Sequence, residues 1–357
     1  MSGAPVGLTE VAALVDRRLC ALFDEQRAIW RPNDARLVEA IDELERIANG
    51  GKRLRAAFAF WGWYGAGQMD GAPVADVASD RILDVCAAFE LLQAFALIHD
   101  DVMDDADTRR NERTIHAAQA ELVRSRGWRG EPRRYGEGVA ILIGDLSHVY
   151  ADQLIGNDSD QARRIWDQLR IELNLGQYLD MRTAAASELD RVTAQRVATF
   201  KSALYTIVRP LQLGACLGGV QSDDVMARLE EYGRPAGQAF QLRDDLLGVF
   251  GDADTVGKPV GNDLREGKPT ELVAAALERA DSAQHRVLGR IGEPNLSDDE
   301  VHGILAVLHE TGAVVDVERR IDALVVRATQ AAFELPFPLS VQETLAALAR
   351  YVAARQH

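Results

Sequence analysis

Two acidic clusters stand inside stretches that otherwise have the pattern of apolar helices. The first is a DDxxD sequence within residues 99–105, followed by the pair Arg109-Arg110. On a helix, residues i and i+4 share a face, so we expect Asp100 and Asp104 to point the same way. Carboxylates this close repel unless a cation lies between them, and Mg²⁺ takes one or two carboxylates plus substrate phosphates. Because arginines add bidentate contacts to phosphate, the sequence predicts a site for a magnesium-bound diphosphate.

The second cluster, Asp244-Asp245, repeats this arrangement in the apolar stretch 239–247. An isolated acidic cluster is more often a solvated helix face or a helix cap. Residues 94–98, just before Asp100, are apolar on every side, as in a buried helix where unneutralised carboxylates would be costly. Two aspartate clusters in apolar helical stretches make it less plausible that both are merely solvated helix faces or caps. Antiparallel helices could bring the clusters face to face across a cavity, as in metal sites of bundle cores.

Basic residues near these clusters could meet the charge of a diphosphate. The sequence GGKRLR at 50–55 allows close approach of the backbone to an anion, and it offers Lys52 and Arg55 at i and i+3. A basic hexamer alone is as often a surface feature. Lys201, Lys258 and Lys268 are further cations in apolar or glycine-rich settings, although each taken singly is more often a solvated lysine.

Composition and net charge limit the classes of partner. The formal net charge of −15 argues against a nucleic-acid-binding surface, because the phosphate backbone would be repelled. Cys20, Cys86 and Cys216 are scattered and predict neither a disulfide framework nor a zinc site. The chain begins without a signal-peptide pattern and has no stretch of about 18 uninterrupted apolar residues, so we expect a soluble, cytoplasmic protein with no membrane span.

Helical periodicity extends along nearly the whole chain. The stretches with this pattern are 11–22, 82–96, 165–181, 192–217, 225–249, 271–291, 301–308 and 341–354. Loops are expected at 65–73, 124–138, 251–270 and 292–298, and residues 335–338 break the pattern again. The segment 251–270 is too long for a simple turn, and loops of this length are often functional. With no repeat, linker or alternating strand pattern, we expect a single all-α domain over residues 1–357.

Several ordered motifs together resemble one known family. They are GGKRLR (50–55), LLQAFALIHDDVMDDADTRR (91–110), GQYLD (176–180), FKS (200–202), AFQLRDDLLGVFGD (239–252) and GKPVGNDLREGKPT (257–270). In order and approximate spacing the chain resembles a trans-isoprenyl diphosphate synthase of the polyprenyl synthetase family, and within it the bacterial short-chain geranylgeranyl and farnesyl diphosphate synthases. The resemblance covers about residues 40–275. It implies a large helical bundle around a central cavity, the isoprenoid synthase type I fold.

The resemblance also implies roles for individual residues. The metal ligands for three Mg²⁺ ions would be Asp100, Asp104 and Asp244, with Asp101 and Asp245 in support. The residues that hold the allylic diphosphate would be Arg109, Lys201, Gln241, Lys258 and Lys268, of which Lys201, Gln241 and Lys258 would take part in catalysis. Isopentenyl diphosphate would bind to Lys52, Arg55, Gln93 and Arg110.

The implied activity is prenyl transfer. The diphosphate of the allylic substrate leaves once its charge is neutralised, and the double bond of isopentenyl diphosphate attacks the resulting carbocation. Proton loss then gives a longer trans allylic diphosphate. Residues beside the cation should be weak nucleophiles, and Gln177, Ser202 and Phe240 fit that description. The segment 251–270 would act as a lid that excludes water, and a homodimer is expected from the family alone.

Product length depends on the residues just before the first motif. Phe95 lies roughly 7 Å along the helix from Asp100, where in this family the growing tail is stopped. An aromatic residue there beside the small Ala96 resembles the pattern for the C20 product, geranylgeranyl diphosphate. Farnesyl diphosphate (C15) is the nearest alternative, and the ordinary interpretation is that Phe95 is a core residue.

Two departures from the family pattern accompany the resemblance. Gly248 stands where a full second DDxxD would have its third aspartate, so metal binding there should depend on Asp244. Arg113 stands where the family often has proline after the arginine pair, with no consequence that we can derive.

Other functions compete with prenyl transfer. A class I terpene cyclase would share the helical fold but would need neither GGKRLR nor Gln93. A non-catalytic subunit of a heteromeric synthase could dispense with the metal ligands, which this chain keeps. A general phosphate-binding helical module is the remaining alternative, and the ordered motifs disfavour it.

Overall fold

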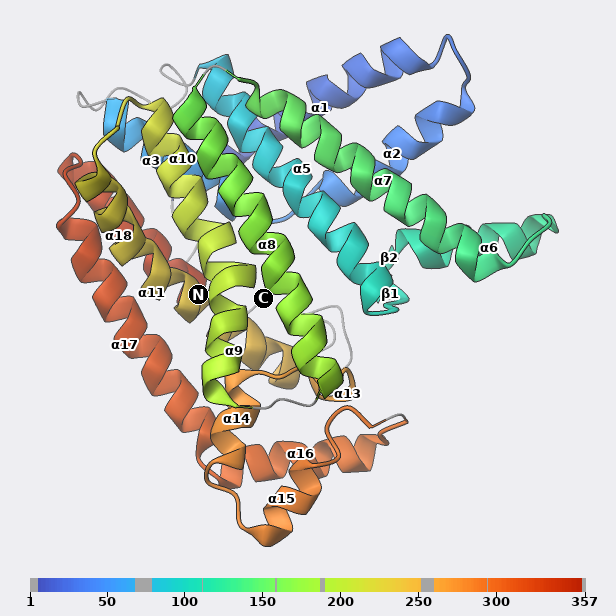
Figure 1. Ribbon diagram of the computed structural model, residues 1–357, viewed down its shortest axis with the longest axis vertical. Coiled ribbons are helices and arrows are strands. Elements are labelled where there is room, and N and C mark those ends of the chain that lie inside the picture. Colours follow the sequence, from blue (N-terminus) through green and yellow to red (C-terminus); the bar gives the residue numbers. More distant parts are fainter. Residues whose placement is uncertain are drawn as a thin grey trace.

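The computed structural model describes residues 6–67, 79–110, 112–157, 159–186, 190–251, 260–293 and 295–354, and they form long helices packed side by side (Figure 1). In chain order the helices are α1 (Val6–Trp30), α2 (Arg36–Ala48), α3 (Leu54–Gly67), α5 (Asp80–Met103), α6 (Ile115–Arg126), α7 (Pro132–Ile155), α8 (Asp160–Ala186), α9 (Arg191–Val197), the π-helix η1 (Ala198–Val208), α10 (Arg209–Leu217), α11 (Asp223–Phe250), α13 (Asn262–Arg265), α14 (Glu271–Leu277), α15 (Ser282–Leu288), α16 (Asp298–Glu310), α17 (Ala313–Phe333) and α18 (Leu339–Ala353). The all-α prediction is confirmed.

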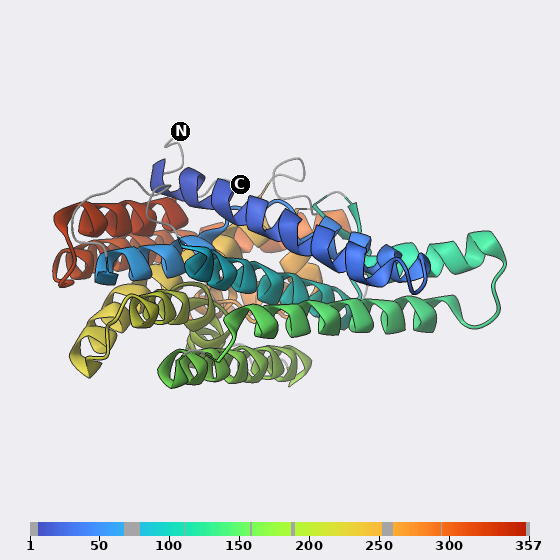
Figure 2. The ribbon, with the colours of Figure 1, turned by 90° about the horizontal axis from the view of Figure 1, so that it is seen from above.

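Helix α5, which carries the first acidic cluster, runs through the middle of the molecule. It lies between α1 and α7 in the view of Figure 2 and also packs against α3. Phe89 and Leu92 on this helix are fully buried, and the Phe89 ring meets the edge of Trp166 from α8 at 5.5 Å. By length and hydropathy α5 could cross a membrane, but 61% of its most apolar window is buried by other helices. The core position of α5 accounts for its apolar composition.

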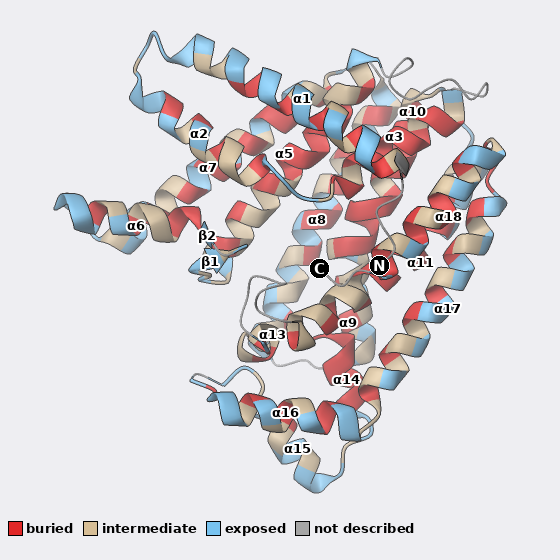
Figure 3. Cartoon of the chain, turned by 180° about the vertical axis from the view of Figure 1, so that it is seen from behind, coloured by how far each residue is buried: buried red, intermediate tan, exposed pale blue. Residues whose placement is uncertain are grey.

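Two hydrophobic clusters form the core, and α11 contributes to both. Tyr232 and Phe240 belong to the larger cluster, which joins α1–α3, α5, α7, α8 and α18. Leu242 and Val249 belong to the smaller cluster, which joins the end of α11 to α13–α17. Helix α3 is buried along most of its length, whereas the outer face of α1 is exposed (Figure 3).

The predicted helix 192–217 is helical throughout, as α9, η1 and α10 in direct succession, but its middle part, η1, is a π-helix. Two glycines on neighbouring helices allow η1 to approach them closely. A Cβ at Gly176 of α8 would lie 2.8 Å from the backbone nitrogen of Lys201, and one at Gly237 of α11 would lie 2.6 Å from Ala203 Cβ. π-helical turns are frequently found at functional sites, and this one contains Lys201 and Ser202.

Other predicted boundaries were wrong in detail. The expected loop 124–138 is mostly helical, because Pro132 starts α7 and the Glu131 side chain accepts hydrogen bonds from two backbone amides of its first turn. The stretch 271–291 is two helices, since a capping box headed by Asp281 starts α15.

Short elements that the sequence did not predict also occur. Strands β1 (Thr108–Arg109) and β2 (Glu112–Arg113) pair after the first acidic cluster. The helix α13 lies inside the expected loop 251–270, of which residues 252–259 lie outside the described part of the chain. α13 packs on α11, so this segment is partly ordered by the second acidic helix.

Candidate active site

One cavity of about 390 Å³ gathers most of the residues that the sequence singled out. It opens between α3, α5, η1 and α11 and is lined by Lys52, Arg55, Gln93, Phe95, Ala96, Asp100, Arg109, Arg110, Lys201, Ser202, Gln241 and Asp244. An adjoining cavity of about 240 Å³ shares Lys201, Ser202, Gln241 and Asp244 and adds Asp180, Asp245, Asp263 and Lys268. Asp100 from the first aspartate motif and Asp244 from the second therefore line a common cavity, whereas Asp104 lines neither cavity.

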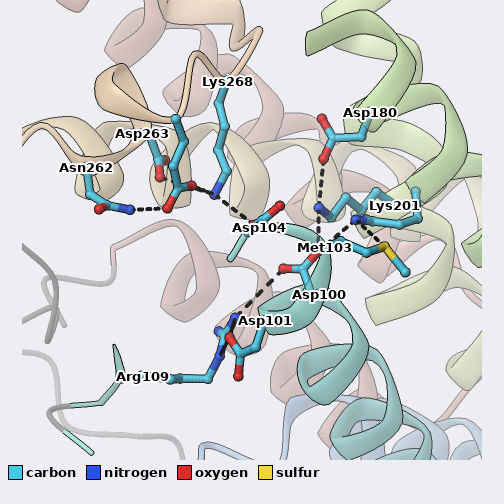
Figure 4. Close-up of polar contacts among 12 residues, drawn as sticks. Asp100, Asp101, Met103, Asp104, Arg109, Asp180, Lys201, Asn262, Asp263 and Lys268 are labelled. Atoms are coloured by element: carbon cyan, nitrogen blue, oxygen red, sulfur yellow. Dashed lines mark hydrogen bonds and ion pairs between the residues drawn. The ribbon is translucent and has the colours of Figure 1, made fainter. Parts of the chain in front are cut away.

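Asp100 lies near the end of α5 among cationic and amide groups (Figure 4). Its Oδ1 accepts a hydrogen bond from Gln177 Nε2 at 2.8 Å and lies 3.4 Å from Lys201 Nζ. Arg109 Nη2 lies 3.8 Å from Asp100 Oδ2. Burial disfavours the charged form of Asp100, but the charges of Lys201, Arg109 and Lys268 outweigh it, so the pKa of Asp100 is lowered. Asp100 is therefore ionised and able to bind a cation.

At Asp104, one turn further along, nearby cations do not outweigh the effects that disfavour the charged carboxylate. Its Oδ2 lies 3.9 Å from Lys268 Nζ. Burial and the negative charge of Asp100 raise the pKa of Asp104 to about 6. A divalent cation between the two carboxylates would relieve this repulsion, and oxygen donors are the ligands that Mg²⁺ prefers. The first motif thus has the chemistry for the predicted ion.

A pre-formed metal cage is absent from the described residues. No group of three or more His, Cys, Asp or Glu side chains there is arranged to hold a metal ion. Mg²⁺ bound by one or two carboxylates, substrate phosphates and water does not require such a cage. The donor set therefore fits an ion that arrives together with a diphosphate.

The second motif presents Asp244 to both cavities, while its buried neighbour Asp245 lines only the smaller one. Asp245 Oδ1 accepts a hydrogen bond from Gln241 Nε2 at 2.7 Å, and Gln241 Oε1 accepts one from the Ser202 hydroxyl. Burial, together with the charges of nearby aspartates, raises the pKa of Asp245 to about 8. Asp245 thus fixes the orientation of Gln241, which in turn contacts Ser202 on η1.

Lys201 lies between the first motif and α8. Its ammonium is 2.7 Å from Asp180 Oδ2 in addition to its contact with Asp100. Burial disfavours the charged ammonium, but these two carboxylates outweigh it and raise the pKa of Lys201. Asp180 had no role assigned from the sequence, although it belongs to the recognised motif GQYLD.

The GGKRLR segment forms a turn in front of α3. Gly50 and Gly51 have φ values of 80° and 93°, a conformation that side chains rarely adopt. A Cβ at Gly51 would lie 3.3 Å from Arg110 Nη2, so this backbone approaches the guanidinium closely. Lys52 Nζ lies 5.8 Å from the centre of the Tyr351 ring of α18. The turn therefore lies against Arg110, and both Lys52 and Arg110 line the larger cavity.

Arg53, in the same segment, is a structural residue that the sequence analysis did not single out. Its side chain is 2% exposed, and it pairs with Glu90 at 3.0 Å and Asp16 at 2.7 Å. It also donates to the carbonyl of Ala48 at 2.7 Å. Arg53 ties the turn to α1, α2 and α5 and so holds its neighbours at the cavity.

The predicted isopentenyl diphosphate residues are linked to one another through η1. The Arg55 guanidinium stacks over the Tyr205 ring at 4.3 Å and donates to Thr206 Oγ1 at 3.1 Å. The Tyr205 hydroxyl donates to Gln93 Oε1 at 2.9 Å. η1 therefore carries both Lys201, near the metal motifs, and Tyr205, near the opposite end of the cavity.

Phe95 and Ala96 line the cavity on α5. The Phe95 ring centre lies 4.6 Å from that of His99 and 4.8 Å from that of His148 on α7, with the latter pair stacked. Phe95 thus has partners that hold it at the cavity wall. Its role in product length stays a prediction.

Of the two lysines in the expected lid, only Lys268 belongs to the described residues. Lys258 lies outside the described residues. Lys268 Nζ lies 2.6 Å from Glu266 Oε2 and 3.3 Å from Asp263 Oδ1 (Figure 4). Lys268 therefore stands close to Asp104 and lines the smaller cavity, whereas Arg109 lines the larger one.

Comparisons with known proteins agree with this geometry. The model of the family Polyprenyl synthetase matches residues 37–308. A short chain isoprenyl diphosphate synthase of Methanothermobacter thermautotrophicus is 30% identical over 90% of this chain and 91% of its own. A geranylfarnesyl diphosphate synthase of Aeropyrum pernix is 31% identical, over 87% and 92%.

One solved structure is similar to this chain over nearly the full length of both proteins. It is the geranylgeranyl pyrophosphate synthase from Corynebacterium glutamicum complexed with isoprenyl diphosphate and magnesium. The TM-score is 0.90 and the identity 35%, with 98% of this chain and 99% of the other covered.

Proposed function

Because the chain belongs to the polyprenyl synthetase family, we propose that it is a Mg²⁺-dependent trans-prenyltransferase that condenses isopentenyl diphosphate with an allylic diphosphate. The observation that carries this proposal is the single cavity lined by Asp100 and Asp244 and, further along, by Lys52 and Arg55. A carboxylate pair for a metal-bound diphosphate and a separate cationic turn for a second diphosphate are the requirements of a two-substrate condensation.

The residues around the first motif would bind and activate the allylic diphosphate. Mg²⁺, when bound, would neutralise charge that develops on the leaving diphosphate. Lys201, Arg109 and Lys268 would contact the same oxygens from three sides, and their charges lie close to Asp100 or Asp104.

The amide and hydroxyl groups on η1 and α11 would face the carbocation. Gln241 and Ser202 are hydrogen-bonded to each other and line the cavity, and neither is a strong nucleophile. Gln177, which donates to Asp100, lines the same cavity. These side chains would orient the substrate while they leave isopentenyl diphosphate as the only competent nucleophile.

Isopentenyl diphosphate would bind at the other end of the cavity, on Lys52, Arg55, Gln93 and Arg110. The anchoring of this turn by Arg53 favours a synthase over a class I terpene cyclase, which needs no second diphosphate site. Retention of Asp100, Asp104 and Asp244 favours a catalytic chain over a non-catalytic subunit.

We propose geranylgeranyl diphosphate as the product. The proposal is supported by Phe95, held by His148 at the cavity wall, and by the 35% identity to a geranylgeranyl pyrophosphate synthase. Farnesyl diphosphate is the alternative on the shorter side. The relative from Aeropyrum pernix makes geranylfarnesyl diphosphate by name, so longer products also belong in the assay.

A homodimer through the outer faces of α7 and α8 is part of the proposal. Apolar side chains are exposed there, among them Leu142 at 69%, Leu175 at 59% and Tyr178 at 66%. Large exposed apolar patches mark interaction sites in soluble proteins. Light scattering should give twice the mass of the chain, and Leu142→Asp combined with Leu175→Asp should give the single mass.

Three further expectations stand as proposals. We propose three Mg²⁺ ions per active site, shared between the two motifs. Residues 1–357 would act as one domain, which is supported by the contribution of α11 to both hydrophobic clusters. The protein would act in the cytoplasm, where its diphosphate substrates are soluble.

The direct test is chain elongation. Purified protein with Mg²⁺, labelled isopentenyl diphosphate and dimethylallyl, geranyl or farnesyl diphosphate should give prenyl products that are resolved by length. Incorporation of label supports a synthase. Cyclic hydrocarbons made without isopentenyl diphosphate would indicate a cyclase, and no turnover with any primer would overturn the proposal.

A further inference from the structure

The position of the missing third aspartate in the second motif is already filled by another carboxylate. Gly248 lies on α11, one turn beyond Asp244. A Cβ placed on Gly248 would collide with Asp263 Oδ2 and would lie 2.6 Å from Asp263 Cγ. The Asp263 carboxylate therefore occupies the space into which an aspartate side chain at residue 248 would project.

Asp263 reaches this place because α13 is docked on α11. Gly261, at φ 73°, turns the chain into α13, and its amide donates to the carbonyl of Val249 at 3.1 Å. Leu264 is 1% exposed within the smaller hydrophobic cluster, and its carbonyl accepts from the Gly292 amide at 2.9 Å. The position of the Asp263 backbone is thus set by packing and backbone hydrogen bonds of α13.

The Asp263 carboxylate faces the space between the two motifs. It lines the same cavity of about 240 Å³ as Asp244 and Asp245. Lys268 Nζ lies 3.3 Å from Asp263 Oδ1 and 3.9 Å from Asp104 Oδ2, so one ammonium spans this carboxylate and the first motif (Figure 4). From this position the Asp263 carboxylate can affect cation binding at the second motif on α11.

We propose that Asp263 supplies the third carboxylate of the second motif in place of residue 248, so that binding of a magnesium diphosphate there requires α13 to be docked on α11. The inference deepens the proposed function and rests on it. It also accounts for a motif that is incomplete in sequence: the carboxylate comes from a separate element, because α11 itself has no side chain at Gly248.

A simpler role for Asp263 would be to hold Lys268. The chain offers a matched control, because Glu266 also pairs with Lys268, at 2.6 Å. Asp263→Asn and Glu266→Gln both remove one charge next to Lys268, but only the first changes the group that lies over Gly248. Both replacements keep the size of the side chain.

The experiment is calorimetric titration of the whole protein with Mg²⁺ and inorganic pyrophosphate. Loss of a group that supports a metal site typically weakens metal affinity by about 10- to 100-fold, which is the change expected for Asp263→Asn. Glu266→Gln should change the affinity by much less. If Glu266→Gln weakens binding as much as Asp263→Asn, the effect is exerted through Lys268 and the inference is wrong.

A carboxylate swap gives a second, independent measurement. Gly248→Asp alone should weaken binding, because the new side chain collides with Asp263. Asp263→Ala alone should weaken it through loss of the charge. The double variant Gly248→Asp with Asp263→Ala should recover an affinity within a few-fold of the original protein. Failure to recover, in a double variant whose circular dichroism and melting temperature match the original, would overturn the inference.

Failure of the proposed function would look different. If the original protein binds no magnesium pyrophosphate, and Asp244→Asn changes nothing, the diphosphate site itself is wrongly assigned. If the original protein binds and Asp244→Asn abolishes binding while Asp263→Asn has no effect, only the inference about Asp263 fails.

Discussion

The ammonium of Lys201 lies 2.7 Å from Asp180 Oδ2, a contact between η1 and α8 that involves neither aspartate motif. The same ammonium lies 3.4 Å from Asp100 Oδ1. Asp180 therefore holds Lys201 beside the first motif, and the positive charge of Lys201 is shared between the Asp180 and Asp100 carboxylates. A diphosphate that approaches Asp100 would meet a cation that is already oriented.

Replacement of Asp180 by Asn should lower the turnover number and leave the KM for isopentenyl diphosphate unchanged. Hydrogen bonds to charged groups contribute about 1.5–3 kcal/mol, so a fall of about 10- to 100-fold is expected if the whole contact serves catalysis. The KM should not change because Lys52 and Arg55 line the larger cavity, whereas Asp180 lines only the smaller one. Steady-state kinetics with each substrate varied in turn measures both quantities.

The exposed Asp322 on α17 provides the control for this charge change. Asp322→Asn should leave kinetics and stability as they are. A turnover number for Asp180→Asn equal to that of Asp322→Asn would show that the Lys201–Asp180 pair has no part in catalysis.

Asp104→Asn should abolish turnover and at the same time stabilise the metal-free protein. Burial and the charge of Asp100 raise the pKa of Asp104 to about 6, above its unfolded value, so the ionised group destabilises the fold. Since one pKa unit corresponds to about 1.4 kcal/mol and the pKa rises from 3.8 to about 6, the gain is expected to be on the order of 3 kcal/mol at neutral pH.

The pH dependence of this gain follows from the sign of the shift. Above pH 6 Asp104 is ionised in the folded protein, so Asn at this position gives its full gain. Below about pH 4 the carboxyl is protonated in both states and the gain should vanish. Urea unfolding in the presence of a chelator, at several pH values, measures the difference between the two proteins. A gain that is the same at pH 4 and pH 8 would contradict this account.

Much of the site could be predicted because its residues are local in sequence. Asp100, Asp104 and Arg109 share one motif, and helical periodicity alone places the two aspartates on one face. The boundary errors also had local signals that went unused. Pro132 at the start of α7 and the Asp281–Gln284 capping box are both recognisable helix starts.

The remainder could not be predicted because it depends on contacts between distant segments. Asp180 meets Lys201, and Asp263 covers Gly248, only after α8, η1, α11 and α13 have packed. The π-helical turn was hidden for another reason. Residues 202–208 are all buried, so no exposed face reveals the period of the helix.

Phe95→Ala should lengthen the product beyond that of the original enzyme. The ring lines the cavity and stacks on His148, so its removal opens space along α5 for a longer chain. Product analysis with farnesyl diphosphate as primer should show a shift of at least one isoprene unit. Phe333, which is 47% exposed on α17, is the control, and Phe333→Ala should leave the product distribution as it was. An unchanged length in Phe95→Ala would place the end of the chain elsewhere.

Arg53→Met should destabilise the protein and weaken binding of isopentenyl diphosphate together. The change leaves Glu90, whose side chain is only 7% exposed, without its cationic partner, and breaking a buried pair costs about 3–5 kcal/mol. The second effect is expected because Lys52 and Arg55 flank the residue that anchors the turn. Urea unfolding measures the loss of stability, and steady-state kinetics measures the KM for isopentenyl diphosphate.

In the double variant Arg53→Met with Glu90→Met no buried charge is left unpaired. Most of the stability should therefore return, because replacing buried ion pairs by apolar residues is often neutral. The raised KM should remain, since the link from the turn to α5 is still weakened. If the double variant were as unstable as Arg53→Met, the loss would come from packing and not from the unpaired carboxylate of Glu90.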